Sequence, residues 1–499
     1  MTNIADFVRD AAGRRPDHPA LVTRSHELTW AEVDRRVDRA ARALSARGLE
    51  RGARVALMIG NRPEFAVAYF GVLRAGLVAV PLNTGYTAHE VARLCADAGA
   101  SVLIHDSGAA RSAEAAGRRS DTLDVVAIDS PEGEAIVGDA GPGRGAFAQP
   151  RTAARDLAVL MYTSGSEGQP KGVMLSHGAL VANVNSLARL RKPAALTADD
   201  RLLIVLPLFH IYGLNAGLGL AAKVGATSVL LERFEPRSSL AAVRDLGVTN
   251  IAGAPPMYVA WSAEDSLRES MDGVRILISG ASALPPSVFQ QFTSITGKPI
   301  WEGYGLTECS PVVTSSLVSH TPRPGSVGRP IAGVQVTLRD ASGHEVVEGD
   351  PGEVWVRSKS LLSGYWPDRA PAVDEDGWFH TGDVAILDES GDYRLVDRRL
   401  DLIIVAGFNV YPREVEAVIA EHPAVAEVAV VGMPHPLTGE SVKAVVVLTP
   451  GVPEPDDLRA FTEKRLARFK CPSIIEFVPK LPRAVSGKVT KGRLRDART

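Results

Sequence analysis

The sequence predicts an α/β protein with a largely parallel sheet, because short apolar runs alternate with helical segments along most of the chain. Residues 31–48 have the apolar spacing of an amphipathic helix, and a buried strand (54–60) and a second helix (64–75) follow. A length of 499 residues exceeds what one hydrophobic core usually holds, so two or more domains are expected. The predicted architecture is therefore layers of helices packed on parallel strands.

The alternation continues well beyond these first elements. Further strands are expected at 77–83, 100–106, 201–207, 227–232, 248–255 and 274–280. Residues 328–395 instead contain short alternating strands separated by glycine-containing turns. This pattern predicts an antiparallel, β-barrel-like subdomain within the large α/β part.

The last hundred or so residues have a third pattern. It consists of a helix (412–421), two strands (425–433 and 441–449), another helix (456–468) and a strand (474–478). Such a short mixed segment is typical of a small α+β domain.

Composition excludes several classes of protein. The net charge of −3 provides no basic field to attract nucleic acid. The three cysteines, Cys95, Cys309 and Cys471, are too far apart in sequence for a disulfide framework or a CxxC metal site. They fit a reducing cytoplasm, which is the expected location. No run of about 18 apolar residues occurs, so no membrane span is expected.

The segment YTSGSEGQPKG, residues 162–172, follows an apolar run at 157–161 that is expected to be a strand. Glycines let a backbone approach an anion closely, and bare N–H groups and hydroxyls can donate hydrogen bonds to phosphate oxygens. Lys171 adds a positive charge. The GxxxxGK[ST] spacing of a P-loop is absent, so the segment predicts a phosphate-binding loop of another kind; a flexible linker is the alternative.

Five separated segments resemble, in the same order, the core motifs of the adenylate-forming superfamily. That superfamily includes acyl-CoA synthetases, peptide-synthetase adenylation domains and luciferases. The segments are YTSGSEGQPKG, GYGLTE (303–308), GWFHTGD (377–383), VDRRLDLIIVAGFNVYPREVE (396–416) and PRAVSGK (482–488). Each motif alone is weak evidence, but five in the correct order are specific.

The resemblance implies a large N-terminal domain (1–397) that binds ATP and the acyl substrate, and a small mobile C-terminal domain (398–499). It also implies the reaction. A carboxylic acid attacks the α-phosphate of ATP, giving acyl-AMP and pyrophosphate, and coenzyme A then displaces AMP. In the family the C-terminal domain rotates between these two steps. The expected small-molecule partners are the acid, ATP with Mg²⁺, and coenzyme A.

Residue roles follow by matching positions to the family motifs. The residues implied to hold the pyrophosphate end of ATP are Thr163, Ser164, Gly165, Ser166 and Lys171.

The GYGLTE motif implies a second group of roles. Glu308 is expected to ligate Mg²⁺, a hard cation that commonly takes one carboxylate plus phosphates and waters. Thr307 is expected to bind the α-phosphate, and Tyr304 to stack on adenine, with a core aromatic as the alternative for Tyr304. Gly303 and Gly305 are expected beside the acyl substrate.

The nucleoside and the C-terminal motifs complete the set. Gly280, Ala281 and Ser282 are expected to line the adenine, and Asp383 to accept hydrogen bonds from both ribose hydroxyls. Arg398 matches the interdomain arginine near the ribose.

Three further residues are assigned by the same matching. Lys488 is the expected catalytic lysine, stabilising charge that develops in adenylation. Gly407 is expected near the pantetheine tunnel. His210 matches an aromatic position that gates the acyl site and is given no acid–base role.

Two positions depart from the family pattern. Glu167 occupies a loop position that is usually Thr or Ser, and a carboxylate beside a triphosphate is unfavourable, so it is expected to face solvent. Leu400 stands at the hinge position that is commonly Asp or Lys, and Asp401 follows it.

The acyl pocket is expected to be lined by residues 210–219, 253–257 and 303–313. These segments contain no Arg or Lys, which argues against a dicarboxylic acid. Small residues favour a medium- or long-chain fatty acid, with an aryl acid as the alternative. A standalone enzyme that loads an acyl carrier protein is another alternative. A third is a non-catalytic binding module, but the chain retains the residues expected for catalysis: Lys171, Glu308, Asp383 and Lys488.

Overall fold

A computed structural model describes residues 2–139, 146–164, 170–368, 371–398, 403–405, 408–410, 412–435, 439–466, 468–483 and 489–495. The chain separates into two compact units. The large unit comprises Met1–Val336, Val356–Phe379 and Gly391–Tyr393, and the small unit comprises Thr337–Trp355, His380–Ser390 and Arg394–Thr499. Within the described ranges, no helix combines the length and apolar character needed to cross a membrane.

The large unit contains a nine-stranded sheet of order β15-β14-β13-β12-β11-β9-β10-β1-β2. Its strands are β15 (Arg329–Pro330), β14 (Val312–Ser315), β13 (Ile300–Gly305), β12 (Ile276–Ser279), β11 (Asn250–Gly253), β9 (Arg201–Ile204), β10 (Thr227–Leu230), β1 (Pro19–Val22) and β2 (Glu27–Thr29). The strands from β13 to β1 pair in parallel, and the pairs at the two edges are antiparallel.

A seven-stranded sheet in the same unit has the order β18-β8-β7-β4-β3-β5-β6. Its strands are β18 (Tyr365–Trp366), β8 (Pro170–Ser176), β7 (Leu157–Ser164), β4 (Val78–Pro81), β3 (Arg54–Met58), β5 (Ala100–His105) and β6 (Asp124–Ala127). The strands from β7 to β6 are parallel, whereas β7, β8 and β18 pair antiparallel.

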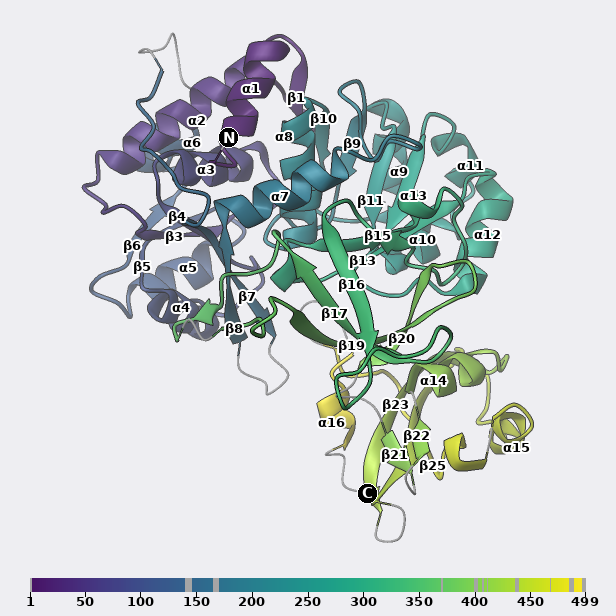
Figure 1. The fold of residues 1–499 in the computed structure, drawn as a ribbon. Coiled ribbons are helices and arrows are strands. Elements are labelled where there is room, and N and C mark those ends of the chain that lie inside the picture. The colour runs from purple at the N-terminus through teal and green to yellow at the C-terminus, as the bar shows by residue number, and fades with distance from the viewer. Residues whose placement is uncertain are drawn as a thin grey trace. The chain divides into compact units, whose positions relative to one another are not determined.

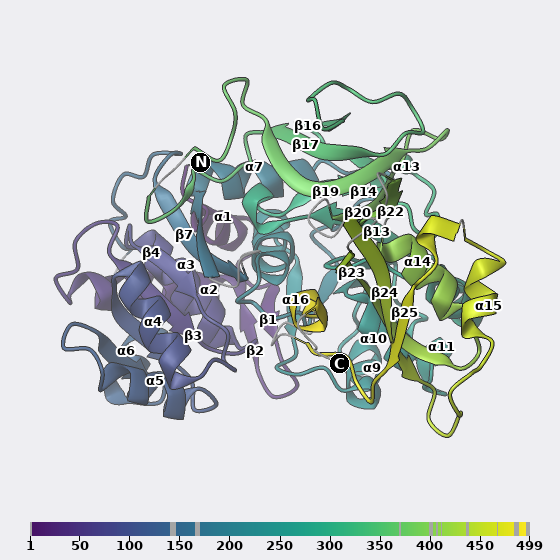
Figure 2. The same ribbon diagram turned by 90° about the horizontal axis from the view of Figure 1, so that it is seen from below.

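Helices of the N-terminal half lie between these two sheets, as Figures 1 and 2 show. They are α1 (Asp6–Arg14), α2 (Trp30–Ser45), α3 (Pro63–Arg74), α6 (Pro131–Val137), α7 (His177–Leu187) and α8 (Leu220–Val224). Helix α2 contacts β1 and β2, α3 contacts β3 and β4, and the two helices pack on each other. Thr29 begins α2 with a capping box: its side chain accepts from the Glu32 backbone while the Glu32 carboxylate accepts from Thr29 N.

The outer faces of the two sheets carry their own helices and apolar cores. On the nine-stranded sheet, α9, α10 and α12 bury Leu240, Trp261 and Phe292 in one cluster with the strands. These helices are α9 (Pro236–Asp245), α10 (Pro255–Trp261), α11 (Leu267–Ser270) and α12 (Pro286–Thr296). On the seven-stranded sheet, α4 (Ala88–Ala98) and α5 (Ala110–Gly117) bury a second cluster that includes Leu94 and Ala113. A short helix, α13 (Ser316–Ser319), follows β14.

A third sheet has four strands in the order β16-β17-β19-β20. They are β16 (Val334–Arg339), β17 (Gly352–Ser358), β19 (Phe379–Leu387) and β20 (Tyr393–Arg398). Four of the strands in this part of the chain therefore form a separate sheet, whereas β15 and β18 join the two larger sheets.

The small unit contains the sheet β22-β21-β24-β23, with β25 paired to β24. Its elements are β21 (Ile403–Val405), β22 (Phe408–Val410), α14 (Pro412–Ala420), β23 (Val425–His435), β24 (Gly439–Leu448), α15 (Leu458–Glu463), β25 (Ile474–Phe477) and α16 (Lys491–Arg495). Val415 and Ile419 of α14 pack on Val430 and Val442 of the strands.

The predicted fold class is confirmed: an α/β protein with a large N-terminal part and a smaller α+β C-terminal part. One predicted helix is shorter than expected, because residues 456–468 yield only Leu458–Glu463 before a 3-10 turn at Arg468–Lys470. The stretch after Glu463 offers Leu466 as its only large apolar side chain before the turn, and short helices depend on such packing.

Candidate functional site

Several segments predicted to bind substrates come directly after strands that end at the same edge of the nine-stranded sheet. Strands β9, β11, β12 and β13 are neighbours and parallel, so their carboxyl ends lie together. His210 follows β9, Gly280 follows β12, and Thr307 follows β13. In open α/β sheets ligands bind outside the carboxyl ends of the strands, so this edge is where a site is expected.

His210 is exposed after β9, and its ring lies 4.8 Å from the Phe209 ring, centroid to centroid. The following segment, Tyr212–Gly219, is π-helical. Such turns are rare and occur frequently at functional sites. The Tyr212 hydroxyl is buried and has no hydrogen-bond partner among the described residues.

The predicted adenine segment begins with a tight contact to Tyr212. A Cβ atom on Gly280 would lie 2.8 Å from Cε1 of Tyr212, so only glycine fits there without moving the ring. Ala281 has φ +69°, a left-handed conformation that costs energy for a residue other than glycine. Ala281 and Ser282 are exposed at the end of β12, where a ligand could reach their backbone.

The end of β13 carries Tyr304 between two glycines. Tyr304 is only 8% exposed, so most of its ring packs within the protein. A Cβ on Gly305 would lie 2.2 Å from the Pro311 carbonyl oxygen, and one on Gly303 would lie 3.1 Å from that of Thr314. These glycines therefore allow the close return of β14; their predicted place beside an acyl substrate stays a prediction.

Glu302 is a buried carboxylate in β13 that the sequence interpretation missed. It is 4% exposed, and its oxygens accept hydrogen bonds from the backbone N–H groups of Leu284 (3.4 Å) and Gly325 (3.0 Å). Glu302 thereby connects the middle of β13 to the loop after β12 and to the loop that contains Gly325. The available signal was a charged residue inside the otherwise apolar strand IWEGYG.

Thr307 and Glu308 lie in a 3-10 turn, Thr307–Cys309, that directly follows β13 and contacts β8. Tyr365 donates a hydrogen bond from its hydroxyl to Oε1 of Glu308 at 3.1 Å. In the described part of the chain, no group of three His, Cys, Asp or Glu side chains could hold a metal by itself. A single carboxylate fits Mg²⁺, which usually takes its remaining ligands from phosphates and water.

The predicted phosphate loop joins β7 and β8, which form a hairpin. Thr163 pairs with Lys171, and Ser164 pairs with Pro170. Lys171 is exposed at the base of the loop. Gly165, Ser166 and Glu167, and the side chain of Ser164, lie outside the described residues.

Other predicted residues belong to the small unit or lie outside the description. Asp383 is half-buried in β19, and its backbone N–H donates to Oγ1 of Thr381 at 3.1 Å. Arg398 ends β20, but its side chain is not among those described, nor are Leu400, Gly407 and Lys488.

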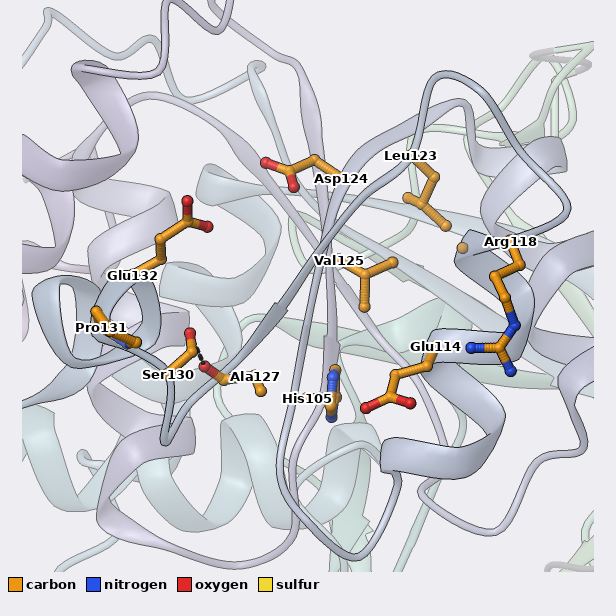
Figure 3. Close-up of a pocket in the computed structure, with 11 residues that line it drawn as sticks. His105, Glu114, Arg118, Leu123, Asp124, Val125, Ala127, Ser130, Pro131 and Glu132 are labelled. Carbon is orange, nitrogen blue, oxygen red and sulfur yellow. Dashed lines mark hydrogen bonds between the residues drawn. The ribbon is translucent and has the colours of Figure 1, made fainter.

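A hollow of about 790 Å³ in the large unit contains none of the predicted residues (Figure 3). It is lined by residues of α5, β6 and the start of α6, with His105 of β5. Arg47 forms ion pairs with two of its acidic residues, Asp124 and Glu132. These ion pairs connect Arg47 to the first residue of β6 and to the first turn of α6, and nothing described there resembles a nucleotide site.

The β7–β8 hairpin, the Thr307–Cys309 turn after β13 and the left-handed Ala281 after β12 all belong to the large α/β unit. This combination fits one class of protein, an enzyme that uses a nucleotide. The chain belongs to the AMP-binding enzyme family, whose model matches residues 8–366, and the AMP-binding enzyme C-terminal domain matches residues 414–488. It is an acid–CoA ligase of the adenylate-forming superfamily.

Individual relatives differ in the acid that their names state. A feruloyl-CoA synthase from Amycolatopsis sp is 38% identical over 94% of this chain and 93% of that protein. A long-chain-fatty-acid–CoA ligase from Yersinia pestis is 33% identical over 99% of this chain and 94% of that protein. ATP-bound MatB from Rhodopseudomonas palustris has a TM-score of 0.89 and 33% identity, covering 99% and 98% of the two chains.

Proposed function

We propose that this protein makes acyl-AMP at the carboxyl edge of β9, β11, β12 and β13 and then acyl-CoA. The observation that carries the proposal is the side-by-side order of these parallel strands, each followed by a predicted substrate-binding segment. An acid oxygen forms a bond to the α-phosphorus while the bond to pyrophosphate breaks. The thiol of coenzyme A then adds to the acyl carbon, and AMP leaves.

The residues of this chain serve these steps by holding charge in place. Lys171, at the base of the hairpin loop, balances the negative charge of the phosphates. Thr307 donates to the α-phosphate from the turn after β13. Glu308 would hold Mg²⁺, which neutralises phosphate charge when bound. The family motifs assign Asp383 and Arg398 to the ribose, Lys488 to the charge that develops on adenylation, and Gly407 to the pantetheine.

When the sequence is considered alone, the small residues of the predicted acyl pocket favour a long-chain acid. The contacts of the glycines in this pocket weaken that argument. A Cβ on Gly213 would lie 2.8 Å from the Pro207 carbonyl oxygen, and one on Gly253 would lie 3.0 Å from the Tyr258 hydroxyl. These small residues therefore let the protein pack on itself, as Gly280 does against Tyr212, and do not by themselves mark an open channel.

The acid that we favour is a substituted aryl acid. The 38% identity to a feruloyl-CoA synthase supports this choice. The second candidate is a medium- or long-chain fatty acid, favoured by the fatty-acid–CoA ligase relatives.

A substrate panel tests the proposal. Pyrophosphate release is measured with ATP, Mg²⁺ and hydroxylated or aminated aryl acids, unsubstituted aryl acids and fatty acids of increasing length, and the thioester products are identified by mass spectrometry. We expect the highest kcat/KM with a substituted aryl acid. Preference for a fatty acid would select the second candidate, and no release with any acid would contradict the catalytic function.

The same assay distinguishes the acceptor. Coenzyme A and an acyl carrier protein are supplied in parallel after adenylate has formed. Thioester formation with coenzyme A is expected, and transfer to the carrier protein alone would overturn the assignment of coenzyme A.

A further inference from the structure

Residues 362–366, which we call the strap, lie beside β8 in the seven-stranded sheet. Ser363 N donates to the Met174 carbonyl oxygen at 2.8 Å, and Met174 N donates to that of Gly364 at 3.1 Å. Tyr365 then pairs with Val173, and Trp366 pairs with Gly172. The strap is therefore fixed to the strand that begins directly after the phosphate loop.

The strap also holds Glu308 at two points. Leu362 N donates to the Glu308 carbonyl oxygen at 2.8 Å, and the Tyr365 hydroxyl donates to Oε1 of the same residue at 3.1 Å. One short segment thus connects the backbone and the carboxylate of Glu308 to the hairpin that carries Lys171. These connections set the place of the carboxylate relative to β8.

The hydrogen bond between these two side chains has a fixed direction. A carboxylate only accepts hydrogen bonds, so the Tyr365 hydroxyl is the donor and Oε1 of Glu308 the acceptor. This bond restricts the rotation of the Glu308 side chain.

We propose that Tyr365 is a positioning residue that orients the Glu308 carboxylate for Mg²⁺–nucleotide binding. The proposal rests on the role of Glu308 given under the proposed function. A carboxylate held in one orientation loses less conformational entropy when it ligates a metal. Removing the phenolic oxygen weakens metal binding while the strap remains paired with β8 through its backbone.

Trp366 provides a matched control in the same strap. Its Nε1 donates to the Asp97 carbonyl oxygen at 2.7 Å, and the Arg54 guanidinium lies 5.6 Å from its ring centre. Trp366 pairs with β8 next to Tyr365, yet its side chain bonds to another part of the unit. Trp366→Phe therefore perturbs the strap without removing the bond to Glu308.

The first experiment measures metal binding directly. Mn²⁺ is titrated into each protein in the presence of α,β-methylene-ATP, and free Mn²⁺ is followed by electron paramagnetic resonance. Tyr365→Phe is expected to raise the Kd for Mn²⁺ about tenfold, the scale of one hydrogen bond to a charged group. Trp366→Phe is expected to bind as the unmodified protein does, and Glu308→Gln to bind far more weakly than either.

The second experiment measures pyrophosphate release against Mg²⁺ concentration. For Tyr365→Phe, half-maximal rate is expected at about tenfold higher Mg²⁺, with kcat nearly restored at saturation. General damage to the fold would lower kcat at every Mg²⁺ concentration and would not be rescued.

The outcomes separate the two proposals. Unchanged Mn²⁺ affinity in Tyr365→Phe, or an equal loss in Trp366→Phe, overturns the role of Tyr365. Unchanged affinity in Glu308→Gln overturns the metal-binding role of Glu308 itself, whatever Tyr365 does.

Discussion

His177 shows how one buried side chain links stability to pH. It is 1% exposed at the start of α7, and its Nδ1 accepts a hydrogen bond from Ile4 N at 3.3 Å. Burial lowers the pKa of His177 from 6.5 to about 4, and the nearby Arg51 adds to this effect while Asp156 opposes it. The folded protein therefore holds this imidazole neutral where the unfolded chain would protonate it.

The predicted consequence is a loss of stability between pH 6.5 and pH 4. In that window the unfolded state binds more protons, so the free energy of unfolding falls as pH falls. Between pH 7 and pH 5 this group alone is expected to cost about 2 kcal/mol. Urea unfolding of the protein and of His177→Gln at both pH values measures it: the variant is expected to lose less, and equal losses would contradict the assignment.

At the scale of elements, helices α2 and α3 approach each other unusually closely. A Cβ on Gly71 of α3 would lie 2.4 Å from the Cβ of Ala40 of α2. These two helices lie between the two sheets of the large unit, so their spacing influences the packing of both. Glycine at position 71 is therefore required by packing and not by backbone conformation.

Gly71→Ala is expected to destabilise the large unit by about 1–3 kcal/mol, the usual cost of overpacking. Gly13→Ala is the matched control, since Gly13 is also helical and a Cβ there would contact nothing within 4 Å. The control is expected to gain roughly 0.5–1 kcal/mol from helix propensity. Thermal or urea unfolding measures the stability of both variants. Equal stability of the two variants would mean that α2 and α3 can move apart without loss of free energy, and would contradict the prediction.

At the scale of the whole molecule, the proposed reaction uses different residues in its two steps. We propose a boundary between the domains at residues 397 and 398, with Lys488 in the C-terminal domain. The match of a separate C-terminal domain to residues 414–488 supports this assignment. Adenylation would need Lys488, whereas thioester formation would not.

Lys488→Ala is therefore expected to lower the rate of adenylation by a factor on the order of 100 or more, since it removes a charge that stabilises the transition state. Thioester formation from supplied acyl-AMP is expected to stay near the unmodified rate. Single-turnover measurements of each half-reaction test the prediction, with Lys491→Ala as a nearby lysine control. Equal loss in both half-reactions would contradict the role of Lys488.

The sequence by itself determined the alternation of strands and helices and the order of the motifs. Local patterns suffice for both, because apolar periodicity reports burial and a motif such as GYGLTE is contiguous. Apolar periodicity predicted the strand at 274–280, which the structure has at Ile276–Ser279. The family resemblance assigned roles to Thr307 and Glu308, and these roles stay predictions.

Only the tertiary structure decided what these residues contact. The hydrogen bond between Tyr365 and Glu308, for example, joins residues that are 57 positions apart in the sequence. The structure also showed that tyrosine rings pack against Gly253 and Gly280. From the sequence alone, such tightly packed glycines look the same as glycines that line an open pocket. The physical reason is that side-chain contacts depend on strand order and close packing, neither of which is encoded within a single short segment.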